Sequence, residues 1–343
     1  MPAANLRQGS TLYALGLHRT EGAHWYDIKL GAPFSKGGAA RLWHVEKPGL
    51  ALPLVAKIWN KQGLGEVFST PVEATRVLRL VANRDQLHNH IPAVVWPRRL
   101  LFTRPERDNV QRDFRGFTMS RLDHMRKLHH IIALSQKGQS PLTFDQSKRM
   151  VLMLCEALQK LHEHPWQFRI ADFSPNNIMF NEDFTTLAFV DADSYQFLYP
   201  DPESRTNIQF RPTGFTLGYS SPKAVKDELL RKTGDPPVLV DEQHDQFVLA
   251  IHIFQIYMAH LGLGGAAPFQ KFERGNENDA IAAGRFTHDM PKDHQPNAFV
   301  QEQYLRIPAP VREAFSRTFA RGKPLTTREW ADLCSTHWRS LQP

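Results

Sequence analysis

The spacing of apolar residues changes along the chain, from short runs typical of strands to the periodicity typical of helices. Before residue 120, runs rich in β-branched and aromatic residues at 25–30, 41–45 and 54–59 are separated by Gly, Pro and Ser, which predicts strands. After residue 140, apolar residues recur every three or four positions, which predicts helices. Strands followed by helices favour an α+β protein with two parts.

The first part, residues 1–119, is expected to be small and β-rich with one main helix. Two further strands are predicted at 91–102 and 114–119. The helix is predicted to start at Thr70, with Pro71 in its first turn and Glu73 three residues after Thr70. This arrangement is typical of a capping box, in which the first and fourth residues bond each other's backbone.

The second part, residues 120–343, is expected to be larger and helical. Thr143 and Gln146 form another capping-box pattern before a single apolar stripe, and two short strands are predicted at 177–180 and 187–190. A Pro-rich and polar segment follows at 198–222. Residues 247–263 are apolar but contain two histidines, so a buried helix at 247–261 is expected rather than a membrane span. A ligand is expected in a cleft between the two parts.

Composition narrows the classes of function. The two cysteines, Cys155 and Cys334, argue against a disulfide framework and favour a reducing, cytoplasmic setting. The first residues lack a basic stretch followed by an apolar run, so we expect no signal peptide. A net charge of +7 favours acidic partners such as nucleotides. No basic block with interleaved aromatics occurs and the histidine pairs lack metal-site spacing, so we expect neither nucleic-acid binding nor a structural metal.

Four polar residues have the types and order that phosphoryl transfer needs. Lys57 lies at the end of a predicted strand, Asp172 and Asn177 are five residues apart, and Asp191 follows another strand. The reaction needs a base at the accepting hydroxyl, oxygen ligands for Mg²⁺ and a cation on the phosphates. The alternative is structural: Lys57 faces solvent on an edge strand, and the acidic residues cap turns around Pro175.

The motifs around these residues resemble those of the protein kinase superfamily. Leu54-Val55-Ala56-Lys57 is similar to the VAIK strand, and residues 35–42 stand where the Gly-rich loop is expected. Residues 170–179 resemble the catalytic loop, and 191–196 the metal-binding motif that follows it. Asp245 resembles the aspartate at the start of the buried kinase helix. Residues 218–222 stand where the APE motif is expected. The pattern D-x-D-S-[FY]-Q with a non-RD loop is similar to that of bacterial eukaryotic-like Ser/Thr kinases, and the resemblance covers roughly residues 25–340.

The resemblance implies a two-lobed kinase fold that binds ATP and Mg²⁺ and phosphorylates a protein substrate, with no membrane partner. Asp172 is implied as the base, Lys57 as the phosphate-binding cation, and Asn177 with Asp191 as the magnesium ligands. Glu73 is either the partner of Lys57 or only a helix cap, and Glu66 is a poorer candidate for that partner. The other implied nucleotide contacts are Ser35, Gly37, Gly38 and Leu42 in the loop, Ala56 and Met179 above and below the base, Met119 as gatekeeper, and Ser120 to Leu122 at the adenine.

Several positions depart from the kinase pattern. Ser35 and Ala40 replace two of the three loop glycines, and Ala171 replaces the arginine before the base. Ser174 stands where a lysine is usual and Lys223 where a glutamate is usual. Three functions therefore stay open: an active Ser/Thr kinase, an ATP-binding pseudokinase that acts as an interaction module, and an aminoglycoside-type small-molecule phosphotransferase. Thr213 and Thr216 are candidate phosphorylation sites by position.

Overall fold

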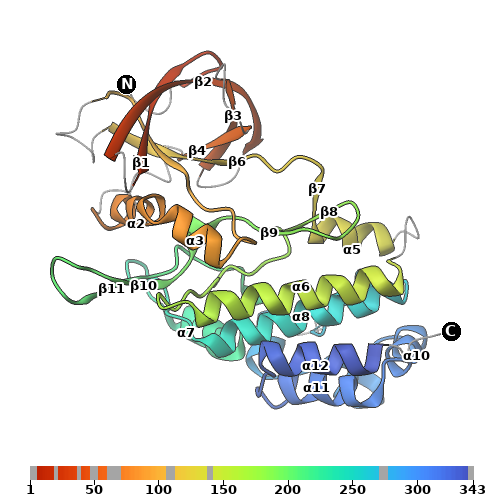
Figure 1. The fold of residues 1–343 in the computed structure, drawn as a ribbon. Coiled ribbons are helices and arrows are strands. Elements are labelled where there is room, and N and C mark those ends of the chain that lie inside the picture. The colour runs from red at the N-terminus through yellow and green to blue at the C-terminus, as the bar shows by residue number, and fades with distance from the viewer. Residues whose placement is uncertain are drawn as a thin grey trace. The chain divides into compact units, whose positions relative to one another are not determined.

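The chain divides into two compact units, Met1–Asp123 and His124–Pro343, and each is described by itself. The structure, a computed structural model, describes residues 6–18, 22–36, 40–46, 53–59, 71–105, 113–136, 142–269 and 277–338. The first unit is β-rich and the second is mainly helical (Figure 1). The predicted α+β class is therefore confirmed.

A closed barrel of six strands forms the first unit, in the order β1-β2-β3-β4-β6-β5, with β1 also paired to β5. All neighbouring pairs are antiparallel. The sequence prediction missed β1 and with it the closure, because the 11–18 segment is apolar on both faces and lacks a clear alternation. The strands are β1 (Thr11–His18), β2 (Gly22–Lys36), β3 (Ala40–Glu46), β4 (Leu54–Trp59), β5 (Arg99–Phe102) and β6 (Phe114–Ser120).

The barrel strands bury side chains on both faces. Inward-facing residues from β1 to β5 form one cluster, which includes Leu12, Trp43 and Ala56. Outward-facing residues such as Trp59 and Phe117 form a second cluster with the α2 helix (Pro71–Ala82). Strands β1 to β5 therefore contribute alternate residues to two cores.

The helical part of the first unit begins at Pro71, where the sequence predicts the start of a helix. Thr70 and the side chain of Glu73 lie outside the described residues, so the capping box there stays a prediction. Residues Arg84–His90 form a second helix, α3. The strand predicted at 91–102 is shorter than expected and comprises only β5.

The second unit is built around the buried helix α8. Nearly every residue of α8 is buried, and α6 lies beside it, with α11 and α12 packed against the pair (Figure 1). The predicted capping box at Thr143 and Gln146 is confirmed at the start of α6. No helix in the described ranges has both the length and the apolar character needed to cross a membrane. The helices are α5 (Leu128–Gln136), α6 (Phe144–Glu163), α7 (Pro222–Leu230), α8 (Glu242–His260), α9 (Glu277–Ala282), α10 (Ala298–Leu305), α11 (Ala309–Phe319) and α12 (Thr327–His337).

Two small sheets accompany these helices. One has three strands in the order β7-β8-β9, with β7 at Met125–Lys127, β8 at Ile178–Asn181 and β9 at Leu187–Phe189. The other is a hairpin of β10 (Phe197–Pro200) and β11 (Asn207–Phe210), within the segment expected to be only Pro-rich and polar. Because β8 and β9 are antiparallel neighbours, the start of β8 and the end of β9 lie at the same edge of the sheet.

Candidate functional site

Asp172 lies in the loop between α6 and β8, where its carboxylate accepts three hydrogen bonds from two neighbours. The Thr216 N–H and hydroxyl both donate to Oδ1, at 3.2 and 2.8 Å. The Asn177 amide donates to Oδ2 at 3.0 Å and also to the Asp172 backbone carbonyl at 3.0 Å. The carboxylate is thereby fixed in one orientation in a half-buried position.

Asn177 and Asp191 are brought together by the pairing of β8 with β9. Asn177 precedes β8, and its carbonyl accepts from the N–H of Val190, the residue before Asp191. Because the amide nitrogen of Asn177 donates to Asp172, its amide oxygen is the atom that a cation would meet. An amide oxygen and a carboxylate are hard ligands of the kind that Mg²⁺ prefers.

The backbone at Asp191 is left-handed, with a φ of 70°. Its carbonyl accepts from the N–H and the hydroxyl of Ser194 at 2.9 and 2.7 Å, which holds this conformation. Burial raises the pKa of the Asp172 carboxyl, and the charge of Asp191 raises it further, against the hydrogen bonds from Thr216 and Asn177. A cation near both carboxylates would reduce the electrostatic repulsion between them.

Asp245 on α8 holds the backbone of the segment that precedes Asp172. Its fully buried carboxylate accepts from the N–H of Ile170 at 3.0 Å and from that of Ala171 at 3.4 Å. The residue that caps the helix is instead Asp241, which accepts from the His244 N–H at 3.0 Å. The alternative that Asp245 is only an N-cap is therefore wrong.

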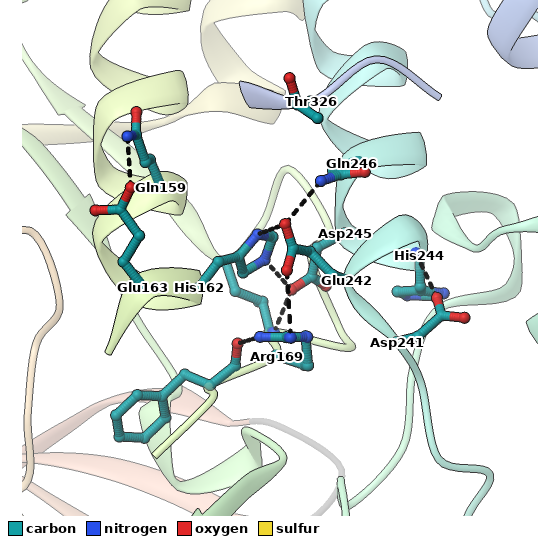
Figure 2. A network of polar contacts seen from close by, with 12 residues as sticks. Gln159, His162, Glu163, Arg169, Asp241, Glu242, His244, Asp245, Gln246 and Thr326 are labelled. Carbon is teal, nitrogen blue, oxygen red and sulfur yellow. Dashed lines mark hydrogen bonds and ion pairs between the residues drawn. The ribbon is translucent and has the colours of Figure 1, made fainter. Parts of the chain in front are cut away.

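His162 lies between two carboxylates of α8, as Figure 2 shows. Its ring nitrogens lie 3.0 Å from Asp245 and 3.5 Å from Glu242. Burial alone lowers the pKa of His162, but the hydrogen bonds with Asp245 and Glu242 outweigh it and raise the pKa overall. Arg169 contacts Glu242 at 3.4 Å in the same network (Figure 2).

In the first unit, Lys57 lies on β4 in a cross-strand row with Leu42 on β3 and Phe117 on β6. Its ammonium group lies 5.7 Å from the centre of the Phe117 ring. Because Phe117 belongs to the cluster that includes α2, Lys57 points to the helix-covered side of the barrel rather than to its interior. Ser35 on β2 continues the row opposite Leu42.

Ala56, expected above the base of the nucleotide, does not share this face. Adjacent residues of a strand point to opposite faces, and Ala56 is fully buried in the inward cluster with Trp43. Val55 is the neighbour that shares the face of Lys57. It pairs across strands with Met119, which packs against the outward cluster.

The remaining predicted nucleotide contacts are distributed over both units. Ser120 accepts from Arg98 at 3.1 Å, and Leu122 is half-buried in the segment after β6. Met179 lies on β8 of the second unit, between Lys127 and Ala188. Gly37, Gly38 and Glu66, and the side chain of Glu73, lie outside the described residues, so their roles stay predictions.

The departures from the kinase pattern have local consequences. Lys223 pairs with Asp227 one turn along α7, and both border a pocket of about 370 Å³ beside Gly322 and Pro324. Ser174 is buried, and its carbonyl accepts from the N–H of Asn177.

Sequence reasoning missed the contact between Thr216 and Asp172, and it gave no role to His162, His244 or His252. Each of these residues has a partner more than 40 positions away, so no local spacing could reveal those contacts. Thr216 appeared only as a candidate phosphorylation site. In the structure its hydroxyl donates a hydrogen bond to the Asp172 carboxylate.

No group of three or more His, Cys, Asp or Glu side chains in the described part of the chain could hold a metal ion by itself. A cation at Asn177 and Asp191 would therefore need further oxygen ligands, such as phosphates and water. No protein-family model matches the sequence, and a search of characterised proteins found no match either.

Proposed function

We propose that this chain is an ATP-dependent protein Ser/Thr kinase that transfers the γ-phosphate to a protein hydroxyl with Mg²⁺. The observation that carries the proposal is the arrangement around Asp172, whose carboxylate is oriented by Asn177 and Thr216 close to Asp191. A fixed, half-buried carboxylate can accept the proton of an alcohol as it attacks phosphorus.

The residues present suit a magnesium ion that carries phosphates. Asn177 Oδ1 and the Asp191 carboxylate would hold the cation, and the ion would neutralise charge on the phosphate oxygens. The left-handed turn at Asp191 and its two bonds from Ser194 keep this ligand in place. A strained residue that is held firmly is a reasonable marker of a functional position.

Lys57 would place a positive charge beside the negatively charged phosphates. Its position on the helix-covered face of β4 supports this role, because a lysine in the barrel interior could not reach a ligand. The kinase assignment requires Lys57 and the acidic residues to meet the same triphosphate.

Transfer of radiolabelled phosphate from ATP to the chain or to a generic protein substrate tests the proposal. Asp172→Ala and Lys57→Met are expected to lose at least about 100-fold in rate, since each removes a group used in transfer. Asp183→Ala and Lys29→Met are matched controls at exposed positions and should keep the rate of the wild type. Incorporation that is unchanged in both site variants would refute the assignment.

The second candidate is an ATP-binding pseudokinase, favoured by the exposed ion pair of Lys223 with Asp227 and by Ser174 in place of a lysine. Thermal unfolding with and without ATP and Mg²⁺ separates the two. Stabilisation by the nucleotide that depends on Asp191, with no phosphate transfer, would favour the pseudokinase.

A further inference from the structure

Two buried histidines of α8 contact the backbone on either side of Asp172. His244 Nε2 lies 3.0 Å from the carbonyl of Ala171, and His252 Nε2 lies 2.7 Å from the carbonyl of Phe173. Since a carbonyl can only accept, each Nε2 must carry the proton. Each Nδ1 is then an acceptor in the neutral ring.

Burial favours this neutral form in both rings. It lowers the pKa of His252 to about 4, although the Phe173 carbonyl, which accepts from the ring, and the nearby Gln255 side chain act in the opposite direction. Burial likewise lowers the pKa of His244. Both side chains are therefore single-donor, single-acceptor bridges near neutral pH.

The acceptor side of His244 faces the start of α7. Its Nδ1 lies 3.3 Å from the hydroxyl and 3.4 Å from the N–H of Ser221, the residue that caps α7. His244 thus joins the residue before Asp172 to the residue that begins α7.

The acceptor side of His252 faces Gln255 and, beyond it, Tyr219. The Gln255 amide contacts the Tyr219 hydroxyl at 3.0 Å, and the Tyr219 ring stacks on His252 with centroids 5.5 Å apart. With the amide nitrogen toward Tyr219, two buried acceptors, His252 Nδ1 and Gln255 Oε1, have no hydrogen-bond partner among the described residues. Exchanging the amide nitrogen and oxygen lets Gln255 donate to His252 and accept from the Tyr219 hydroxyl, which satisfies both.

The contacts that begin at His252 lead back to Asp172 through Tyr219 and Thr216. The Tyr219 N–H donates to the Thr216 carbonyl at 2.8 Å, and Thr216 donates twice to the Asp172 carboxylate. The loop that carries Asp172 and the segment 216–221 are therefore linked through both imidazoles as well as directly.

We propose that His244 and His252 are positioning residues that tie the backbone on both sides of Asp172 to the segment 216–221, and so fix the direction of the Asp172 carboxylate. The importance of that direction for turnover rests on the proposed function. The linkage itself does not, and it can be measured without any substrate.

Hydrogen exchange of the Thr216 amide tests the linkage directly. His252→Phe keeps a buried ring but loses both polar contacts, so Thr216 protection should fall by about tenfold, the factor for one lost hydrogen bond. His252→Gln places an amide N–H near the Nε2 position and should restore part of that protection. His288→Phe is the matched control, because His288 is also buried and stacked but contacts Gln301 and Tyr304.

Nitrogen NMR of the imidazoles gives a second readout. Both rings should show the Nε2–H tautomer near neutral pH, and His252 should stay neutral down to pH 6. Tyr219→Phe should shift the His252 Nδ1 signal while leaving that of His244 unchanged. An Nδ1–H tautomer at either ring would overturn the proposal. So would Thr216 protection that falls no further in His252→Phe than in His288→Phe.

Measurements of turnover separate the proposed histidine linkage from the proposed kinase activity. If the wild type transfers phosphate, His252→Phe should lower kcat roughly tenfold or more with the KM for ATP unchanged, because misplacement of a base affects the transition state. A lower kcat in His288→Phe of the same size would count against the linkage. If the wild type transfers none, the proposed function fails while exchange and NMR still decide on the linkage.

Discussion

Replacing Asp245 by Asn tests how strongly α8 holds the backbone that precedes Asp172. The carboxylate is fully buried and accepts from two backbone N–H groups and from His162. Asn keeps the shape but has one acceptor oxygen and no charge. If that oxygen takes the bonds from Ile170 and His162, the Ala171 N–H faces an amide N–H and is left without an acceptor.

The magnitude follows from these contacts. Losing the charge weakens the two short bonds by about 1 kcal/mol each, and an unsatisfied buried N–H costs about 1–3 kcal/mol. The expected loss in the free energy of unfolding is about 3–5 kcal/mol, which lowers the Tm by roughly 10 °C for a unit of this size.

Urea unfolding followed by circular dichroism, with thermal unfolding in parallel, measures this loss. Asp241→Asn on the same helix is the matched control, because Asn caps helices about as well as Asp and should cost less than about 0.5 kcal/mol. A loss below about 1 kcal/mol in Asp245→Asn, or one equal to that of the control, would refute the tethering role.

Three further predictions concern stability. The pKa of His162 is raised in the folded state, so its contribution to the free energy of unfolding is complete below its unfolded pKa of 6.5 and is lost as pH rises through the folded pKa. The pKa of Asp245 is lowered, so its contribution to the free energy of unfolding is present above its unfolded pKa of 3.8 and is lost at lower pH. Unfolding free energies measured from pH 4 to 9 should therefore fall on the alkaline side in the wild type, and His162→Gln should flatten that fall. Gly116→Ala should lower the free energy of unfolding by about 3 kcal/mol or more, because the φ of Gly116 is 156° and a Cβ would overlap the Lys57 carbonyl. Gly9 lies in open space at a φ of 84°, so Gly9→Ala should lower it by only about 1–2 kcal/mol. Equal Tm values of the two variants would contradict this prediction. Thr143→Ala should cost about 1 kcal/mol in urea unfolding by removing the capping box of α6, and no change would show that the cap is dispensable.

The parts of the fold that depend on local pattern could be predicted from the sequence. The strands β4, β8 and β9 and the long helix α6 follow runs with clear periodicity and caps. Asn177 and Asp191 are adjacent to two of these strands, so their approach follows from the pairing of β8 with β9. Barrel closure by β1 depends on a long-range pairing with β5, which local pattern does not encode.

Two features of the site did not follow from local pattern. Ala56 was expected above the base and Lys57 on the phosphates, but side chains alternate along a strand, so these adjacent residues lie on opposite faces of β4. His244 and His252 lie in an apolar run that indicates only a buried helix. Their contacts join residues more than 70 positions apart, so only the tertiary structure reveals them.

The proposed function requires Lys57, Asn177 and Asp191 to serve one nucleotide and its cation. A crystal structure of the chain with a non-hydrolysable ATP analogue and Mg²⁺ tests it most directly. We expect the cation at about 2.1 Å from Asn177 Oδ1 and from the Asp191 carboxylate, with Lys57 Nζ on the phosphates and Asp172 facing the γ-phosphate. A nucleotide bound elsewhere, or a cation that neither Asn177 nor Asp191 contacts, would contradict the account.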